Sequence, residues 1–228
     1  MNHLSKRLGL NGNLAWHDIY SFTDPDLLAF IPRPALALLV IIPLTPAWHE
    51  QRLAEDKERT EYTKSGDEDP VIWFKQTIGN ACGSIGLTHC LLNGEASKYI
   101  EPGSTLDQIH KNALPKKQRE RAWVLEDSLE FEKAHAEAFL LGETAQPTLR
   151  EEEHLGQHFV AYIKGKDGHL WELEGSRKGP LDRGLLKDDE DVLSPAAVER
   201  GIGGLMKLES EKGGDLRFSA IALAESFE

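Results

Sequence analysis

Residues 75–94 read Lys75-Gln76-Thr77-Ile78-Gly79-Asn80-Ala81-Cys82-Gly83-Ser84-Ile85-Gly86-Leu87-Thr88-His89-Cys90-Leu91-Leu92-Asn93-Gly94, and they contain both cysteines of the chain. We expect Asn80 to be the N-cap of a helix that stops at Asn93-Gly94, which places Cys82 in the first turn. Unpaired N–H groups and the positive end of the helix dipole favour a thiolate there, the nucleophilic form of cysteine. A helix so rich in small residues is weak in isolation, so the pattern predicts close packing in the core.

Gln76 lies six residues before Cys82 and is a candidate oxyanion donor. Its amide and the backbone N–H of Cys82 would together stabilise a developing oxyanion, and loss of one such donor costs about 3 kcal/mol of barrier. Taken alone, each residue has a simpler interpretation: Cys82 as a small buried side chain and Gln76 as a surface amide. Two helical turns separate Cys90 from Cys82 by roughly 12 Å, which is too far for a disulfide. We therefore expect Cys90 to be a core residue rather than a redox partner of Cys82.

Nine histidines compete for the role of base to the thiol. Apolar and polar residues alternate from 157 onwards, which predicts a β-hairpin. If the hairpin turns about Lys166, His158 pairs with Glu174 on one face of the sheet. That carboxylate would fix the imidazole tautomer while the other ring nitrogen faces the thiol. Glu172 points the same way but pairs with Val160 and is the weaker candidate. An isolated histidine at a strand start is more often structural, but the acid opposite favours catalysis.

Four separated blocks resemble the ubiquitin carboxyl-terminal hydrolases, the small single-domain cysteine deubiquitinases. The blocks are Gln76–Gly83, Gln157-His158-Phe159, Leu170–Gly175 and Leu216–Leu223. The segment from Trp16 to Pro34 is also similar to the start of that family's catalytic domain. Blocks in the same order over nearly the whole chain are far more specific than any single motif.

The resemblance implies an α/β (α+β) papain-like fold, with a central antiparallel sheet flanked by helices and a knotted chain path. It implies one catalytic domain over residues 1–228. By the same resemblance Cys82 is the nucleophile, His158 the base and Gln76 the oxyanion donor. Glu174 stands where the family usually has aspartate, and its side chain is one methylene longer. Some hydrolase triads use glutamate, so activity remains the leading hypothesis and a weakened catalyst the alternative.

Residues 142–156 are expected to form a long exposed loop, and they match in position the family's crossover loop over the catalytic cleft. Such a loop admits only small or flexible leaving groups, although a plain surface connection is the simpler interpretation. The resemblance implies that the basic tail of ubiquitin passes beneath it to reach Cys82. Acidic candidates for pairing with that tail are Glu151 to Glu153, Asp188 to Asp191, and Glu172.

The composition outside these blocks limits the function classes. The chain has 228 residues, with 26 Lys and Arg against 38 Asp and Glu, for a net charge of −12. This balance disfavours nucleic acid and anionic lipid as partners. Two cysteines make no disulfide framework, and neither a secretory signal nor a membrane span is expected, so the cytoplasm is predicted, with the nucleus also possible.

The remaining segments predict the scaffold. A buried strand is expected at Ala35–Ile42, a short helix after the Asp24 N-cap, and a final helix at Pro195–Leu208. Peripheral helices are expected at Thr105–His110 and within 115–145, and a last strand at Leu216–Leu223. The charged residues 50–70 are expected to form a solvated helix and a loop with no part in the chemistry.

The resemblance therefore implies a thiol hydrolase that removes small or flexible adducts from the terminal glycine of ubiquitin or a ubiquitin-like protein. No cofactor is implied, and the protein is expected to be a monomer. The principal alternative is a weakly active or non-catalytic ubiquitin-binding module. Thiol redox chemistry between Cys82 and Cys90 is disfavoured by their spacing. Zinc at His154 and His158 is remote, because Gly156 interrupts any shared helix and neither Cys-x-x-Cys nor His-Glu-x-x-His occurs.

Overall fold

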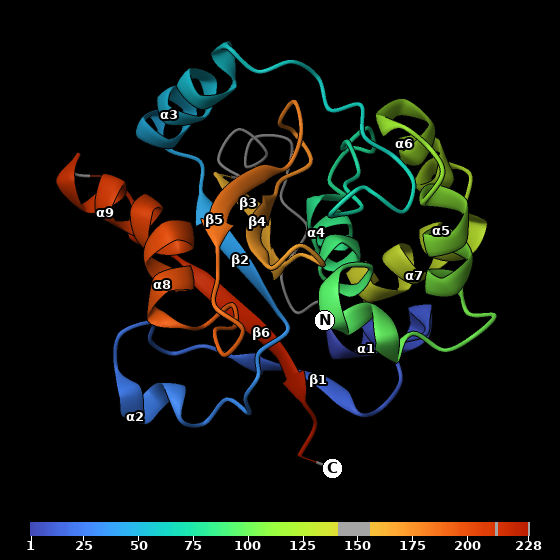
Figure 1. Ribbon diagram of the computed structural model, residues 1–228, viewed down its shortest axis with the longest axis horizontal. Helices are drawn as coiled ribbons and strands as arrows, with labels where there is room; N and C mark the ends of the chain where they lie inside the picture. The colour runs from blue at the N-terminus through green and yellow to red at the C-terminus, as the bar shows by residue number, and fades with distance from the viewer. Residues whose placement is uncertain (141–155, 213, 228) are drawn as a thin grey trace.

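The computed structural model describes residues 1–140, 156–212 and 214–227. Its centre is an antiparallel sheet with the strand order β1-β6-β2-β3-β4-β5 (Figure 1). The strands are β1 (Leu14–Asp18), β2 (Ala37–Pro43), β3 (Gln157–Lys164), β4 (His169–Leu173), β5 (Leu181–Leu185) and β6 (Ser219–Glu225). The predicted fold class, an antiparallel sheet flanked by helices, is confirmed. The knotted path and the single-domain extent stay predictions, and the loop at 142–156 lies outside the described residues except at Gly156.

Strand β2 is the middle of the sheet because its residues are apolar on both faces. It pairs with β3 on one side and with β6 on the other. Leu39 packs into the core on one face, whereas Leu38 and Val40 pack into the core on the opposite face. Burial on both faces explains why the sequence here is continuously apolar rather than alternating.

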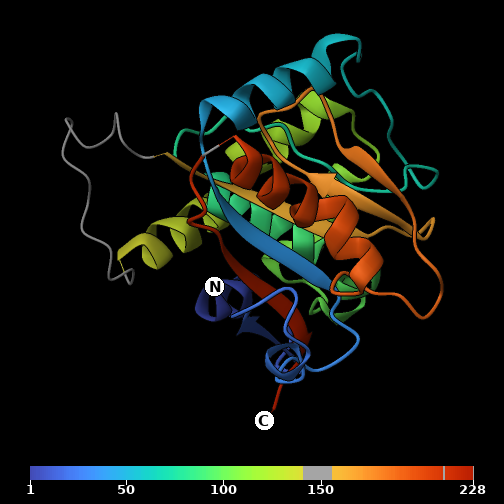
Figure 2. The ribbon, with the colours of Figure 1, turned by 90° about the vertical axis from the view of Figure 1, so that its left-hand side faces the viewer.

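Helices cover both faces of the sheet. One face carries the helices α1 (Asn2–Leu8), α4 (Cys82–Leu91), α5 (Thr105–Ala113), α6 (Gln118–Glu126) and α7 (Leu129–Leu140). The other carries α2 (Pro25–Leu28), α3 (Pro46–Lys57), α8 (Pro195–Val198) and α9 (Gly204–Glu211). Figures 1 and 2 show α4 against the sheet and α3 beside α9 on the far side. The short helix η1 (Gly94–Tyr99) follows α4.

The expected scaffold elements are present with shifted boundaries. Asp24 caps α2 by accepting the N–H groups of Asp26 and Leu27, as predicted. The prediction of a single final helix is wrong, because η3 (Glu199–Gly203) separates α8 from α9 and Gly201 has non-helical backbone angles there. The last strand begins at Ser219 rather than at Leu216. Helix α1 and strand β5 are elements that the sequence analysis missed.

The register of the β3–β4 hairpin differs from the prediction. Tyr162 pairs with Glu172, so the hairpin turns one residue later than Lys166, and Glu172 does not pair with Val160. Gly168, with a φ of 79°, takes the left-handed conformation that this turn needs. A shift of two positions in the pairing keeps every side chain on its predicted face, so the expected neighbours still meet.

Candidate active site

Cys82 is the first residue of α4, and its position in the first turn is confirmed. The N-cap prediction is wrong: Ala81 holds that position, while Asn80 has a φ of 57° and turns the chain into the helix. Asparagine tolerates this left-handed conformation better than most residues. The helix ends at Leu91, two residues before the expected stop. Asn93 instead ties the helix end to Ile72 by hydrogen bonds in both directions.

Glycines in α4 allow the helix to lie directly on strand β3. A side chain at Gly83 would approach the ring of Phe159 to 3.2 Å, and one at Gly86 would meet Leu39 at 2.8 Å. His158 is the residue before Phe159, so the same close packing places its imidazole near enough to Cys82 to lower the pKa of that thiol. The small residues that make α4 a poor isolated helix are therefore what bring these two side chains together.

Glu174 follows the end of β4 and reaches His158 across the hairpin. The imidazole Nε2 of His158 lies 2.5 Å from Oε1 of Glu174. Both side chains are nearly enclosed, with exposed fractions of 11 % and 1 %. The two residues are diagonal rather than directly opposed in the observed register, and the longer glutamate side chain spans this offset. The predicted pair of histidine and acid is formed.

The electrostatics of the three groups favour a thiolate–imidazolium pair. Burial raises the pKa of the Cys82 thiol, but His158 and the backbone N–H groups of Phe159 and Gly83 outweigh it, so the pKa falls below its ordinary value. Burial lowers the pKa of His158, yet its bonds to Cys82 and Glu174 raise it to about 9. Burial opposes ionisation of Glu174 as well, but hydrogen bonds from His158 and Ser176 lower its pKa to about 2. At neutral pH the imidazole is positioned to hold a proton between a sulfur anion and a carboxylate.

Gln76 lies beside the acid rather than at a surface. Its backbone N–H donates to the carbonyl oxygen of Gly175 over 2.8 Å, and a side chain at Gly175 would come within 2.9 Å of the Gln76 Cβ. Its amide Nε2 donates to the carbonyl of Ile78 over 3.4 Å, a long hydrogen bond. The segment that leads to Cys82 is thereby held against the residue after Glu174. The role of Gln76 as oxyanion donor stays a prediction.

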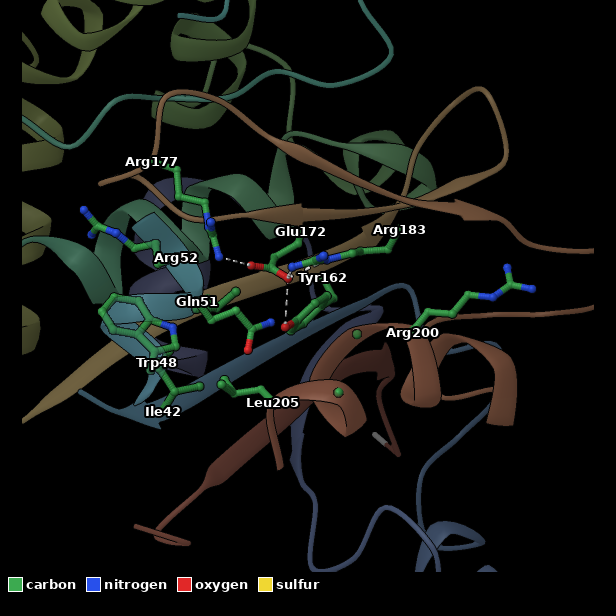
Figure 3. A pocket seen from close by; sticks show the side chains of 13 residues that line it. Ile42, Trp48, Gln51, Arg52, Tyr162, Glu172, Arg177, Arg183, Arg200 and Leu205 are labelled. Atoms are coloured by element: carbon green, nitrogen blue, oxygen red, sulfur yellow. Dashed lines mark hydrogen bonds and ion pairs between the residues drawn. The ribbon is translucent and has the colours of Figure 1, made fainter. Parts of the chain in front are cut away.

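A buried ionic network lies next to Glu174 and surrounds a cavity of about 70 Å³ (Figure 3). Glu172 is central to it: its carboxylate pairs with Arg177 at 3.5 Å and with Arg183 at 2.7 Å, and accepts from Tyr162. Arg177 also lies 4.0 Å from Glu174. Because Glu172 is 5 % exposed and paired with two arginines, it is poorly placed for the role of a surface acid that binds a peptide tail.

Of the other acidic candidates, Asp188 and Asp189 are exposed, whereas the rest either make structural contacts or lie outside the described residues. Asp191 is buried and holds Arg33 and the backbone N–H of Ala35, so it is a structural tie. Glu190 accepts the N–H of Lys187 in the same turn. Glu151 to Glu153, and His154 of the remote zinc alternative, lie outside the described residues. Within the described residues, no group of three potential metal ligands is assembled and no helix is long and apolar enough to span a membrane.

Sequence analysis missed two contributors to the site, Ser176 and Arg52. Ser176 donates its N–H to one oxygen of Glu174 and its hydroxyl to the other. Arg52 of α3 donates to the Ser176 hydroxyl, so the expectation that residues 50–70 have no part in the site is wrong at this position. A serine two residues after an acid is a recognisable turn signal. No local pattern predicts the reach of Arg52 from so distant a segment.

Comparison with known proteins identifies the family. The family model described as ubiquitin carboxyl-terminal hydrolase, family 1, matches residues 1–207. The chain belongs to this family. The predicted assignment to these cysteine hydrolases is therefore confirmed, and the cysteine, histidine and acid described above lie in a chain of that class.

The relatives match the chain from end to end. Ubiquitin carboxyl-terminal hydrolase 3 of Arabidopsis thaliana is 34 % identical over 227 residues, covering 99 % of this chain and 90 % of the relative. Isozyme L1 of Homo sapiens is 31 % identical over 227 residues, covering 99 % and 94 %. The UCH37 catalytic domain of Trichinella spiralis, solved bound to ubiquitin vinyl methyl ester, superposes with a TM-score of 0.70 at 20 % identity, covering 99 % and 91 %. This last likeness supports the ubiquitin carboxyl-terminal hydrolase fold.

Proposed function

We propose that this chain hydrolyses small or flexible adducts from the C-terminal glycine of ubiquitin or a ubiquitin-like protein, with Cys82, His158 and Glu174 as its triad. The observation that carries the proposal is a single imidazole that lies 2.5 Å from a buried carboxylate and also lowers the pKa of the thiol at the start of α4. A nucleophile, a base and an orienting group in that order are the parts that acyl transfer requires.

The reaction proceeds through a thioester. The Cys82 thiolate attacks the carbonyl carbon of the terminal glycine, and the resulting oxyanion accepts hydrogen bonds from the Cys82 N–H and the Gln76 amide. His158 then gives its proton to the leaving amine as the carbon–nitrogen bond breaks. Water attacks the thioester, His158 takes one proton from it, and the carbon–sulfur bond breaks to restore the thiolate and release a carboxylic acid, which loses its remaining proton to solvent.

Glu174 supports activity over the alternative of a passive ubiquitin-binding module. The concern with glutamate is its extra methylene, yet its oxygen lies 2.5 Å from the imidazole and the carboxylate is ionised at neutral pH. A buried carboxylate at that distance stabilises the imidazolium and fixes the ring orientation. The replacement of aspartate by glutamate therefore gives no geometric reason for inactivity.

Ubiquitin is the proposed partner on three grounds. The chain belongs to a family described as ubiquitin carboxyl-terminal hydrolases, and the Trichinella relative was solved with a ubiquitin derivative bound. A net charge of −12 favours association with the basic tail expected of ubiquitin. We further propose a single catalytic domain with a crossover loop at residues 142–156, acting as a monomer in the cytoplasm or nucleus without nucleic acid, membrane or cofactor.

A covalent ubiquitin probe tests the proposal. Ubiquitin vinyl methyl ester should form one adduct per chain, located at Cys82 by peptide mass spectrometry, and Cys82→Ala should form none. Parallel probes built on ubiquitin-like proteins would show which modifier is preferred. Ubiquitin binding without adduct formation would establish the passive binding module instead. An adduct at Cys90 would contradict the assignment of the nucleophile.

A further inference from the structure

Ser176, two residues after Glu174, donates a hydrogen bond to each of the two carboxylate oxygens of Glu174. Oε1 accepts the Ser176 N–H at 2.7 Å in addition to its contact with His158, and Oε2 accepts the Ser176 hydroxyl at 2.9 Å. A glutamate side chain has one more rotatable bond than aspartate, so a carboxylate bound at one oxygen alone could rotate away from the imidazole. With both oxygens bound, its orientation toward His158 is fixed.

The Ser176 hydroxyl is itself positioned from helix α3. Arg52 donates from Nη1 to Oγ of Ser176 over 2.6 Å, which leaves the hydroxyl proton directed at Glu174. The Arg52 guanidinium also lies over the ring of Trp48, 5.4 Å from its centroid. Trp48 lies one helical turn earlier, and its ring centroid is 6.2 Å from that of His158. One face of α3 thus contacts both the base and the serine that holds the acid.

The ionic network nearby does not replace this contact. Arg177 approaches Oε2 of Glu174 only to 4.0 Å, and its guanidinium is also shared with Glu55 and Glu172. Figure 3 shows Arg177 directed at Glu172 and Arg52 beside Trp48. The close hydrogen bond to Oε2 comes from Ser176.

We propose that Ser176 and Arg52 are positioning residues that form a clamp matched to the length of Glu174. The proposal rests on the proposed function, because it takes Glu174 as the orienting acid of the triad. The clamp acts on the chemical step: it holds the carboxylate where the imidazolium needs it and makes no contact with substrate. Ser176 therefore compensates for the additional methylene of Glu174 by fixing the orientation of the carboxylate.

Ser176→Ala, measured alone and together with Glu174→Gln, tests the clamp. Ser176→Ala keeps the N–H bond to Oε1 and acts on the reaction only through Glu174 and His158, so it should lower kcat for a ubiquitin C-terminal ester about 3- to 10-fold, less than the full value of a hydrogen bond to a charged group, and leave KM within about twofold. In the Glu174→Gln background the same serine change should have little further effect, because the group that it positions is already altered. Ser210→Ala, an exposed serine of α9, is the matched control.

The clamp is contradicted if Ser176→Ala leaves kcat unchanged, or if it lowers kcat equally in both backgrounds, as general loss of stability would. The length match has its own test in Glu174→Asp, which should lower kcat about tenfold because the shorter acid cannot reach both His158 and Ser176. An aspartate variant as fast as the parent would overturn the match.

Alkylation of Cys82 by iodoacetamide separates failure of the clamp from failure of the proposed function. This reaction reports on the thiolate without ubiquitin, and Ser176→Ala should slow it by the same 3- to 10-fold, because the serine acts on the thiolate only through Glu174 and His158. If the parent hydrolyses no ubiquitin or ubiquitin-like ester but alkylates rapidly, and Ser176→Ala slows that alkylation, the proposed function fails and the clamp stands. If the parent hydrolyses esters and Ser176→Ala changes neither rate, the clamp alone fails.

Discussion

The two ends of α4 each combine a cysteine with a histidine, and only one end is suited to nucleophilic chemistry. Cys82 is half-buried beside His158, and its pKa is lowered. Cys90 is completely buried, and burial raises the pKa of its thiol. Burial also lowers the pKa of His89 to about 4, whereas the pKa of His158 is raised to about 9.

The difference lies in what surrounds each pair rather than in the residues themselves. His158 has a buried carboxylate on one side and a thiol on the other, so its charged form is stabilised. The Nε2 of His89 accepts the backbone N–H of Phe74, which requires that nitrogen to be unprotonated. A carboxylate bonded to the histidine and partial access to solvent therefore distinguish the proposed nucleophile from the buried thiol on the same helix.

Removal of the Cys82 sulfur should have the largest effect. Cys82→Ala should lower turnover of a ubiquitin C-terminal ester to background, a loss on the order of a millionfold for a covalent nucleophile. Ubiquitin binding should persist, because the change deletes only one sulfur atom. Steady-state kinetics and a binding titration check both points. Substantial residual hydrolysis would refute the assignment of Cys82.

Removal of the base should have the next largest effect. His158→Ala should lower kcat about 10²- to 10⁴-fold, the usual contribution of a positioned acid–base group. The variant should also lose the lowered pKa of Cys82, since His158 is its main stabilising partner. Single-turnover hydrolysis of the ubiquitin ester measures the rate. A variant as fast as the parent would remove His158 from the site.

The orienting acid should have a smaller effect that depends on pH. The active form needs a thiolate and a protonated imidazole, so activity falls at acid pH as Cys82 gains a proton, and at alkaline pH near 9 as His158 loses one. Glu174→Gln removes a charge that raises the pKa of His158, so the alkaline limb should move to lower pH.

A hydrogen bond to a charged group contributes about 1.5–3 kcal/mol, so kcat of Glu174→Gln at neutral pH should fall roughly 10- to 100-fold, less than for His158→Ala. The pH profile of kcat/KM for the parent and the variant provides the measurement. Superimposable profiles would exclude Glu174 from the triad.

The smallest effect on catalysis is expected at the other end of α4. Cys90→Ala should preserve ester hydrolysis within about twofold while lowering the free energy of unfolding by about 1–2 kcal/mol, because a fully buried sulfur is lost from the core. Urea denaturation measures the stability. A large loss of activity in a stably folded variant would show that the two ends of the helix are not as independent as described.

The position of Cys82 was predictable because its signals are local: small residues, a helix start and a family motif lie within a few positions of it. The pairing of His158 with Glu174 was predictable as a shared face but not as a register. Glycines at 165 and 168 allow more than one turn, and only tertiary packing selects among them.

The contacts that hold Glu174 in place could not be predicted from the sequence, because they depend on tertiary packing. Arg52 lies on a charged helix whose sequence resembles a solvated surface, and its contact with Ser176 depends on how α3 packs more than a hundred residues away. Asn80 was misassigned because the same side chain suits both an N-cap and a left-handed turn. Gly201, which interrupts the final helix, packs against Tyr162 of the sheet, a contact invisible in the local pattern.

The most direct test of the account is the pKa of Cys82, measured from the pH dependence of its alkylation rate with peptide mass spectrometry to separate it from Cys90. The account predicts that Cys82 titrates below the ordinary thiol value of about 8.5 in the parent and returns toward it in His158→Ala, with Cys90 unmodified until the chain unfolds. An ordinary value for Cys82 in both proteins would contradict the claim that the imidazole keeps this sulfur ionised.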